Sequence, residues 1–235
     1  MKQKYTYDDF LGIINTLRSE NGCPWDREQT HESLRPCLME EAAEVLAAIR
    51  ILNKTGTPDN LKEELGDVLL QVVMHAQIAK EEGLFTMDDV VEGIASKMVR
   101  RHPHVFGDVQ ADNSEEVLRN WEEIKKKEKE TQSWIESPLK EIPPELPALT
   151  RAPKVLKKAD KHYGISATYA EDVAALEEGL ASLKKEQVSK EEISESLGNM
   201  LMAISDLAKQ YKLPLEQILN DKIEDYIDTH EADSK

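Results

Sequence analysis

The sequence predicts an all-α protein with two tandem helical domains, and three observations support this prediction. Apolar residues recur at spacings of three and four through most of the 235 residues. The chain has only ten Gly and three Phe, and runs of β-branched residues are scarce, which favours helix over sheet. Four prolines between residues 138 and 147 interrupt the helical pattern. We therefore expect an N-terminal domain over residues 1–130, a proline-rich linker over 131–150 and a C-terminal domain over 151–235.

Local signals mark the ends of the helices in the first half. Helices are predicted over residues 6–20, 33–53, 60–82, 86–101 and from 114 onward. Thr6 or Asp8 could cap the first helix, and Thr86, with an acidic residue three positions on, fits a capping signature for the fourth. Thr57 or Asp59 could cap the third, and Gly83 suits its end. In the second half, helices are predicted over 151–163, 169–187, 190–211 and 214–230.

Two acidic clusters lie within the apolar patterns of the second and third predicted helices. They are Glu40-Glu41-x-x-Glu44 and Glu63-Glu64-x-x-Asp67. Glu41 with Glu44, and Glu64 with Asp67, are i,i+3 neighbours on one helix face. If the two helices pack antiparallel, these four carboxylates can converge on one point.

Convergence of four carboxylates requires a compensating charge. Like charges at this spacing destabilise a helix by roughly 0.2–0.5 kcal/mol per pair in water, and by more when partly desolvated. A hard cation such as Mg²⁺, with Mn²⁺ as a substitute, takes oxygen ligands and retains waters and substrate phosphates in its shell. The alternative is a solvated acidic face on two surface helices.

Basic residues collect in one region of this acidic chain. Lys97 and Arg101 are one turn apart on the fourth helix, with Arg100 beside them, and Trp121 and Lys125 repeat the spacing on the next helix. Cations beside a metal-binding acidic cluster suit a polyphosphate, and an aromatic ring beside a cation suits a stacking base. The alternative for such residues is ordinary salt bridging along a helix surface.

The overall charge limits the classes of partner. The formal net charge is −16, so the chain should repel nucleic-acid backbones and anionic membranes. Cys23 and Cys37 form no disulfide framework and have no zinc-site spacing, which indicates free thiols in a reducing cytoplasm. We read neither a signal peptide nor a membrane span, and expect a cytoplasmic protein.

The second half of the chain repeats the first without its charged residues. Residues 63–70, EELGDVLL, resemble residues 195–202, ESLGNMLM. In this alignment Glu41 meets Glu178, whereas Glu44 meets Ala181, Glu64 meets Ser196, Asp67 meets Asn199, Lys97 meets Asp225 and Arg101 meets Thr229. We therefore expect the C-terminal copy to be catalytically silent and to serve packing, dimerisation or regulation.

These motifs together resemble the MazG-type nucleoside triphosphate pyrophosphohydrolases with two tandem MazG domains. The motifs are Cys23-Pro24-Trp25-Asp26, Glu40-Glu41-x-x-Glu44, Glu64-x-x-Asp67 and the run from Lys97 through Arg100-Arg101-His102-Pro103-His104-Val105-Phe106. The resemblance covers nearly the whole chain. It implies an all-α fold whose four-helix core is completed in a homodimer. It also implies Mg²⁺-dependent hydrolysis of nucleoside triphosphates to monophosphate and pyrophosphate.

The resemblance also implies roles for individual residues. The metal ligands would be Glu41, Glu44, Glu64 and Asp67, with Glu40 as a helper or base; the nucleotide would contact Lys97, Arg100, Arg101, Trp121 and Lys125. In some relatives the C-terminal copy works, but here it lacks the ligands. The N-terminal copy must then carry the activity, with an activated water attacking phosphorus in line.

Of two other functions, the sequence supports one, for half of the chain. A helical di-iron carboxylate protein would need Glu-x-x-His pairs, and neither acidic motif contains His. A non-catalytic regulator that binds nucleotides or a partner protein suits the degenerate second half. The complete set of ligands in the first half argues against that role for the whole chain.

Overall fold

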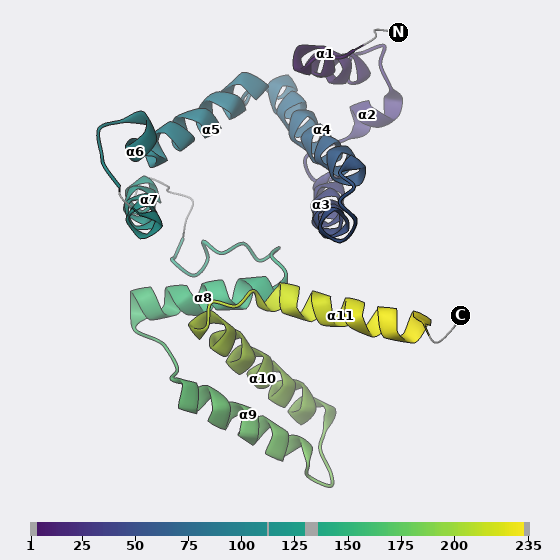
Figure 1. The fold of residues 1–235 in the computed structure, drawn as a ribbon. Helices are drawn as coiled ribbons and strands as arrows, with labels where there is room; N and C mark the ends of the chain where they lie inside the picture. Colours follow the sequence, from purple (N-terminus) through teal and green to yellow (C-terminus); the bar gives the residue numbers. More distant parts are fainter. Residues whose placement is uncertain (1–3, 112, 130–135, 233–235) are drawn as a thin grey trace. The chain divides into compact units, whose positions relative to one another are not determined.

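The computed structural model describes residues 4–111, 113–129 and 136–232, and in these ranges the chain forms eleven helices and no strand. The all-α prediction is confirmed. The helices are α1 (Tyr7–Leu17), α2 (Pro24–Glu28), α3 (Arg35–Thr55), α4 (Asp59–Glu81), α5 (Met87–Arg101), α6 (Pro103–Phe106), α7 (Ser114–Lys129), α8 (Ala148–Tyr163), α9 (Tyr169–Leu183), α10 (Lys190–Gln210) and α11 (Leu215–Ala232) (Figure 1). They belong to two compact units, Met1–Lys127 and Glu128–Lys235.

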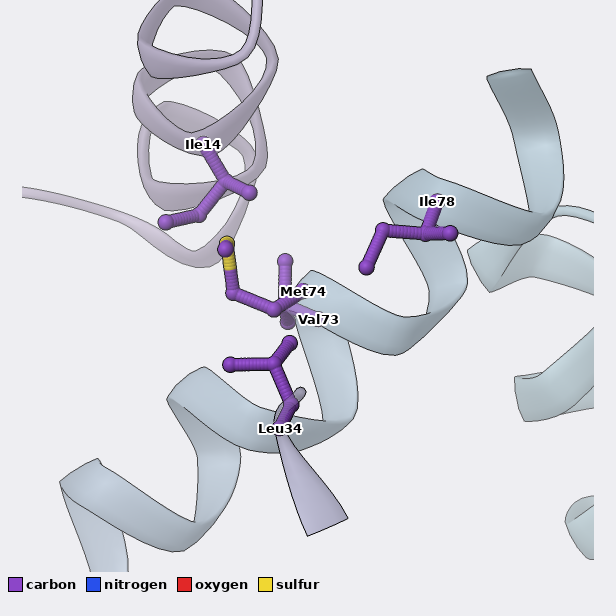
Figure 2. Close-up of a cluster of buried hydrophobic side chains, with 5 residues drawn as sticks. All are labelled: Ile14, Leu34, Val73, Met74 and Ile78. Atoms are coloured by element: carbon purple, nitrogen blue, oxygen red, sulfur yellow. The ribbon is translucent and has the colours of Figure 1, made fainter. Parts of the chain in front are cut away.

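The first unit is built around the paired helices α3 and α4. Gly56, at φ 74°, ends α3 in the left-handed conformation, and the short turn after it makes the two helices antiparallel. Helix α1 packs on α4. The buried core at this junction joins α1 to α4 and to the start of α3 (Figure 2). Its members are Ile14, Leu34, Val73, Met74 and Ile78.

The observed helix ends agree with most of the predicted signals. Thr6 and Thr86 both form capping boxes, each with an Asp three residues on. Gly83 follows α4 with φ 72°, as a residue just beyond a helix end should. The cap of α4 was predicted wrongly, since its N-cap residue is Pro58 and no side chain caps it. The short helices α2 and α6 lie in segments for which no helix was predicted. Each has Pro in its first turn, where the missing N–H costs nothing.

A buried arginine fixes the segment that leads into α3. The Arg18 side chain is only 6% exposed, and its Nε and Nη2 donate to the Glu81 carboxylate at 3.1 and 2.7 Å. Its Nη1 donates to the carbonyl oxygens of Asp26 at 2.5 Å and Gln29 at 3.1 Å. One guanidinium thus joins the end of α1, the α2 turn and the last turn of α4.

The second unit repeats the paired-helix arrangement. Helices α9 and α10 pack together, and α8 contacts both α10 and α11. Gly179 of α9 allows the close approach, because a Cβ there would lie 2.5 Å from Met200 Cγ of α10. Thr168 and Ser189 cap α9 and α10 with capping boxes.

The proline-rich segment packs against the second unit over part of its length. Residues 136–147 contain no helix, as the prolines predicted, and α8 begins at Ala148. Ile142 is buried, and Glu141 forms an ion pair with Lys158 of α8. Residues 130–135 lie outside the described ranges. The division into a catalytic domain, a linker and a degenerate domain stays a prediction.

Candidate active site

Three of the four predicted metal ligands meet between α3 and α4. Glu41 of α3 and Glu64 and Asp67 of α4 each offer a carboxylate oxygen, and these oxygens all lie within 4.8 Å of one another. The antiparallel packing of the helices brings them together, because Glu64 and Asp67 share one face of α4 and Glu41 faces them. We call this set the acidic cluster. All three side chains are half-buried, which strengthens their mutual repulsion.

The other two predicted carboxylates of α3 lie at the edge of the acidic cluster. Glu44 is exposed, and its pKa is raised, first by desolvation, then by its hydrogen bond with Glu41 and by the charges of Glu41, Glu40 and Asp67. Glu40 is also exposed. Glu44 therefore interacts with Glu41 and Asp67 of the acidic cluster without being one of its three members.

A neighbouring amide orients one member of the acidic cluster. Asn60 Nδ2 donates to Glu64 Oε1 at 2.7 Å, one turn earlier on α4. Sequence reasoning missed Asn60, although its i,i+4 spacing to Glu64 was a usable signal. The hydrogen bond restricts the Glu64 carboxylate and leaves its other oxygen for a ligand.

The donor set fits a hard divalent cation. Carboxylate oxygens are the ligands that Mg²⁺ and Mn²⁺ prefer. Opposite ligands of a Mg²⁺ octahedron are about 4.2 Å apart, given bond lengths of about 2.1 Å. The spread of at most 4.8 Å in the acidic cluster is therefore within reach of small side-chain rotations.

The predicted basic and aromatic residues form a second group on α5 to α7. The Arg101 guanidinium carbon lies 5.3 Å from the centre of the Trp121 ring, a cation–π contact. His102 meets the same ring edge-on at 5.0 Å, and its Nδ1 is 2.6 Å from the carbonyl oxygen of Met98, which fixes the imidazole. Sequence reasoning gave His102 no role of its own.

The remaining predicted nucleotide contacts lie on the same helices as this pair. Lys97 is half-buried one turn before Arg101, and Lys125 is half-buried one turn after Trp121. Arg100 is exposed. We call Lys97, Arg101, Trp121 and Lys125 the basic group.

The acidic cluster and the basic group lie on different parts of the first unit. Helix α5 begins near the end of α4 and diverges from it (Figure 1). Glu64 and Asp67 are in the first half of α4, whereas Arg101 is the last residue of α5. One chain in this conformation does not bring the two groups to the same point.

The positions of the second unit that the sequence alignment pairs with Glu64 and Asp67 carry no carboxylate. Ser196 is buried and Asn199 is exposed on α10, at the places of Glu64 and Asp67. Among the described residues, Glu41, Glu64 and Asp67 are the only three acidic, histidine or cysteine side chains grouped closely enough to hold a metal ion. Within the same residues, no helix combines the length and apolarity needed to span a bilayer.

Comparison with known proteins identifies the family. A family model described as the MazG nucleotide pyrophosphohydrolase domain matches residues 29–106, from the segment before α3 to the end of α6. The chain is 42% identical over 214 residues to the nucleoside triphosphate pyrophosphohydrolase/pyrophosphatase MazG of Thermotoga maritima, covering 91% of this chain and 79% of that protein. It is 40% identical over 226 residues to the nucleoside triphosphate pyrophosphohydrolase of Escherichia coli, covering 92% and 84%.

A further relative matches only part of its own length. The chain is 52% identical over 153 residues to the protein YabN of Bacillus subtilis, and the match covers 65% of this chain but 30% of YabN. The matched residues therefore span less than a third of the length of YabN. The two alignments that extend over both units, together with the match of the family model to α3–α6, show that the chain belongs to the MazG family of nucleotide pyrophosphohydrolases.

Proposed function

We propose that the first unit hydrolyses nucleoside triphosphates to nucleoside monophosphate and pyrophosphate with a divalent cation held by the acidic cluster. The observation that carries this proposal is the meeting of Glu41, Glu64 and Asp67 between two antiparallel helices. The relatives from Thermotoga maritima and Escherichia coli, both named nucleoside triphosphate pyrophosphohydrolases, are matched over 79% and 84% of their length and support the same reaction. The chain is accordingly an enzyme of that class, an acid-anhydride hydrolase.

The carboxylates have distinct parts in this proposal. Glu41, Glu64 and Asp67 would hold the cation, Mg²⁺ or its substitute Mn²⁺, with Glu44 as the fourth proposed ligand. When bound, the cation supplies Lewis acidity, which lowers the pKa of a water molecule and offsets phosphate charge. Glu40 is the base candidate that receives the proton of the attacking water. The water oxygen forms a bond to the α- or the β-phosphorus. The bond from that phosphorus to the oxygen that bridges the α- and β-phosphoryl groups breaks, and pyrophosphate is released.

The basic group acts on the nucleotide. Lys97 and Arg101 neutralise charge that develops on the phosphates, with Arg100 as a further cation beside them. Trp121 offers an aromatic face to the base, and Lys125 lies one turn away. The cation–π contact of Arg101 with Trp121 supports a shared site for base and phosphate.

A homodimer would complete this site. Large apolar side chains of α3 and α4 remain exposed, and this surface is typical of a helix pair that packs against a second pair. They include Met39 at 59%, Leu46 at 69%, Leu65 at 53% and Leu69 at 38% exposure. A second copy on this face would form a four-helix core and bring another basic group toward the acidic cluster. The net charge of −16 argues against nucleic acid as a partner, and the two free cysteines support a reducing, cytoplasmic location.

Product analysis tests the proposal. The protein is incubated with nucleoside triphosphates and Mg²⁺, and the products are resolved by anion-exchange chromatography. We expect monophosphate and pyrophosphate in equal amounts, and loss of turnover in Glu41→Gln. Diphosphate and orthophosphate as primary products, or full turnover in Glu41→Gln, would reject the reaction or the site.

We also propose that the second unit is catalytically silent. Ser196 and Asn199 stand where the first unit has Glu64 and Asp67, and neither can supply a carboxylate. Glu178, the counterpart of Glu41, is therefore the matched control in the experiment above. Its Gln variant should keep the wild-type turnover, and a loss equal to that of Glu41→Gln would refute the silent role.

A further inference from the structure

A row of polar side chains continues along α4 from the acidic cluster. Gln71 follows Asp67 by four residues and His75 follows Gln71 by four, so the three lie on one face of the helix. Both ends of the row face the chain of α3. Asp67 meets Glu41, and His75 Nδ1 is 2.8 Å from Nδ1 of His31, just before α3, with the two rings stacked. Gln71 therefore lies on the α3-facing side, between the acidic cluster and the histidine pair.

Gln71 is buried without a hydrogen-bond donor for its oxygen. The residue is 5% exposed, and its Oε1 is fully covered yet accepts no hydrogen bond from the described residues. A buried acceptor without a donor destabilises a fold, so most such atoms in proteins are paired. Oε1 of Gln71 therefore lacks a hydrogen-bond donor among the residues that the structure describes.

The direction of the side chain indicates where that donor would come from. Helical side chains lean toward the N-terminus of their helix, so Gln71 covers the turn that carries Asp67. The charged groups on that side are the carboxylates of the acidic cluster, which accept hydrogen bonds when ionised. On the other side, His75 Nδ1 is already engaged with His31. A hydrogen-bond donor between Gln71 and the acidic cluster must therefore belong to the ligand that the acidic cluster binds.

We propose that Gln71 is a positioning residue whose Oε1 accepts a hydrogen bond from a water molecule in the coordination shell of the divalent cation. This inference rests on the cation site of the proposed function. Mg²⁺ dehydrates reluctantly and keeps several waters, which are strong donors. Partners in the outer shell of a metal site typically alter affinity by 10–100-fold, and Gln71 would act at the lower end through a single hydrogen bond.

Two substitutions separate this role from packing. Gln71→Met keeps the length of the side chain and removes the acceptor, whereas Gln71→Glu keeps the acceptor and adds charge. Mn²⁺ affinity is measured by calorimetry on the full chain, and Tm is measured in EDTA. We expect Mn²⁺ to bind about 10-fold more weakly to Gln71→Met, with an unchanged or higher Tm, and at least as tightly to Gln71→Glu.

The controls distinguish failure of this inference from failure of the proposed function. Gln77→Leu, the same loss of an amide on another face of α4, should leave Mn²⁺ affinity unchanged. Wild-type affinity in Gln71→Met, or an equal loss in the Met and Glu variants, would overturn the role of Gln71 while the cation site stands. If Glu41→Gln also binds Mn²⁺ like the wild type, the cation site is wrong and the inference falls with it.

Discussion

Neutralising one member of the acidic cluster should stabilise the metal-free protein and abolish its response to Mg²⁺. Asp67→Asn removes the repulsion of Asp67 with Glu41 and with Glu64. The oxygens lie within 4.8 Å of one another, and two unit charges at that distance repel by about 0.9 kcal/mol at the dielectric constant of water. Loss of two such pairs amounts to about 1.7 kcal/mol, and screening in 0.1 M salt reduces the gain to about 1 kcal/mol.

Urea unfolding in EDTA and in excess Mg²⁺ measures both effects. We expect Asp67→Asn to exceed the wild type by about 1 kcal/mol in EDTA and to lose the stabilisation that Mg²⁺ gives the wild type. Glu63→Gln is the matched control, because Glu63 is an exposed carboxylate of the same helix outside the acidic cluster. It should change stability by no more than about 0.5 kcal/mol and keep the Mg²⁺ response. A destabilised Asp67→Asn that still responds to Mg²⁺ would refute the reasoning.

Three further predictions concern Arg18, Asp172 of the second unit, and the assignment of activity to the first unit. Arg18→Met should destabilise the protein by about 2 kcal/mol in urea unfolding, near the low end for charged hydrogen bonds because Glu81 is 38% exposed. Hydrogen bonding from Arg18 is the main cause that lowers the pKa of Glu81. The stability that this interaction contributes is present above the ordinary value of 4.5 and is lost as pH falls through the lowered pKa, so Arg18→Met should weaken the dependence of the free energy of unfolding on pH in this acid range. Burial, and then repulsion from the carboxylate of Asp206, raise the pKa of Asp172. The stability that Asp172 contributes is therefore lost as pH rises from the ordinary value of 3.8 through the raised pKa. In Asp172→Asn, the free energy of unfolding should lack this dependence on pH. Turnover should vanish in Glu41→Gln and persist in Glu178→Gln, and equal losses would contradict a silent second unit.

The sequence predicted the features that depend on local spacing. The capping box of Thr86 was predicted from a hydroxyl and a carboxylate three residues apart, and the structure contains it. Thr6, one of two residues expected to cap the first helix, is the observed cap. The pairing of the acidic helices followed from two amphipathic segments joined by a short turn, so the meeting of Glu41 with Asp67 was predictable. The sequence did not predict that Glu44 would lie at the edge of the acidic cluster. Helical spacing does not indicate which carboxylate of α3 faces α4.

The features that were missed depend on tertiary contacts. Arg18 and Glu81 are 63 residues apart in the chain, and nothing in the pattern around either residue indicates their ion pair. Helical periodicity could not predict that Oε1 of Gln71 lacks a partner among the described residues. A polar residue in an apolar stripe is as consistent with an exposed position as with a functional site. The separation of the acidic cluster from the basic group depends on the direction in which α5 leaves α4 (Figure 1). The turn at Gly83 connects the two helices, but its sequence does not reveal the angle between them.

Anomalous diffraction from a crystal soaked in Mn²⁺ would locate the cation in the protein. We expect an anomalous peak between the carboxylates of Glu41, Glu64 and Asp67, about 2.2 Å from their oxygens, and none at Ser196 and Asn199 of the second unit. A well-occupied Mn²⁺ elsewhere in the chain, with these three side chains turned apart into solvent, would contradict this expectation.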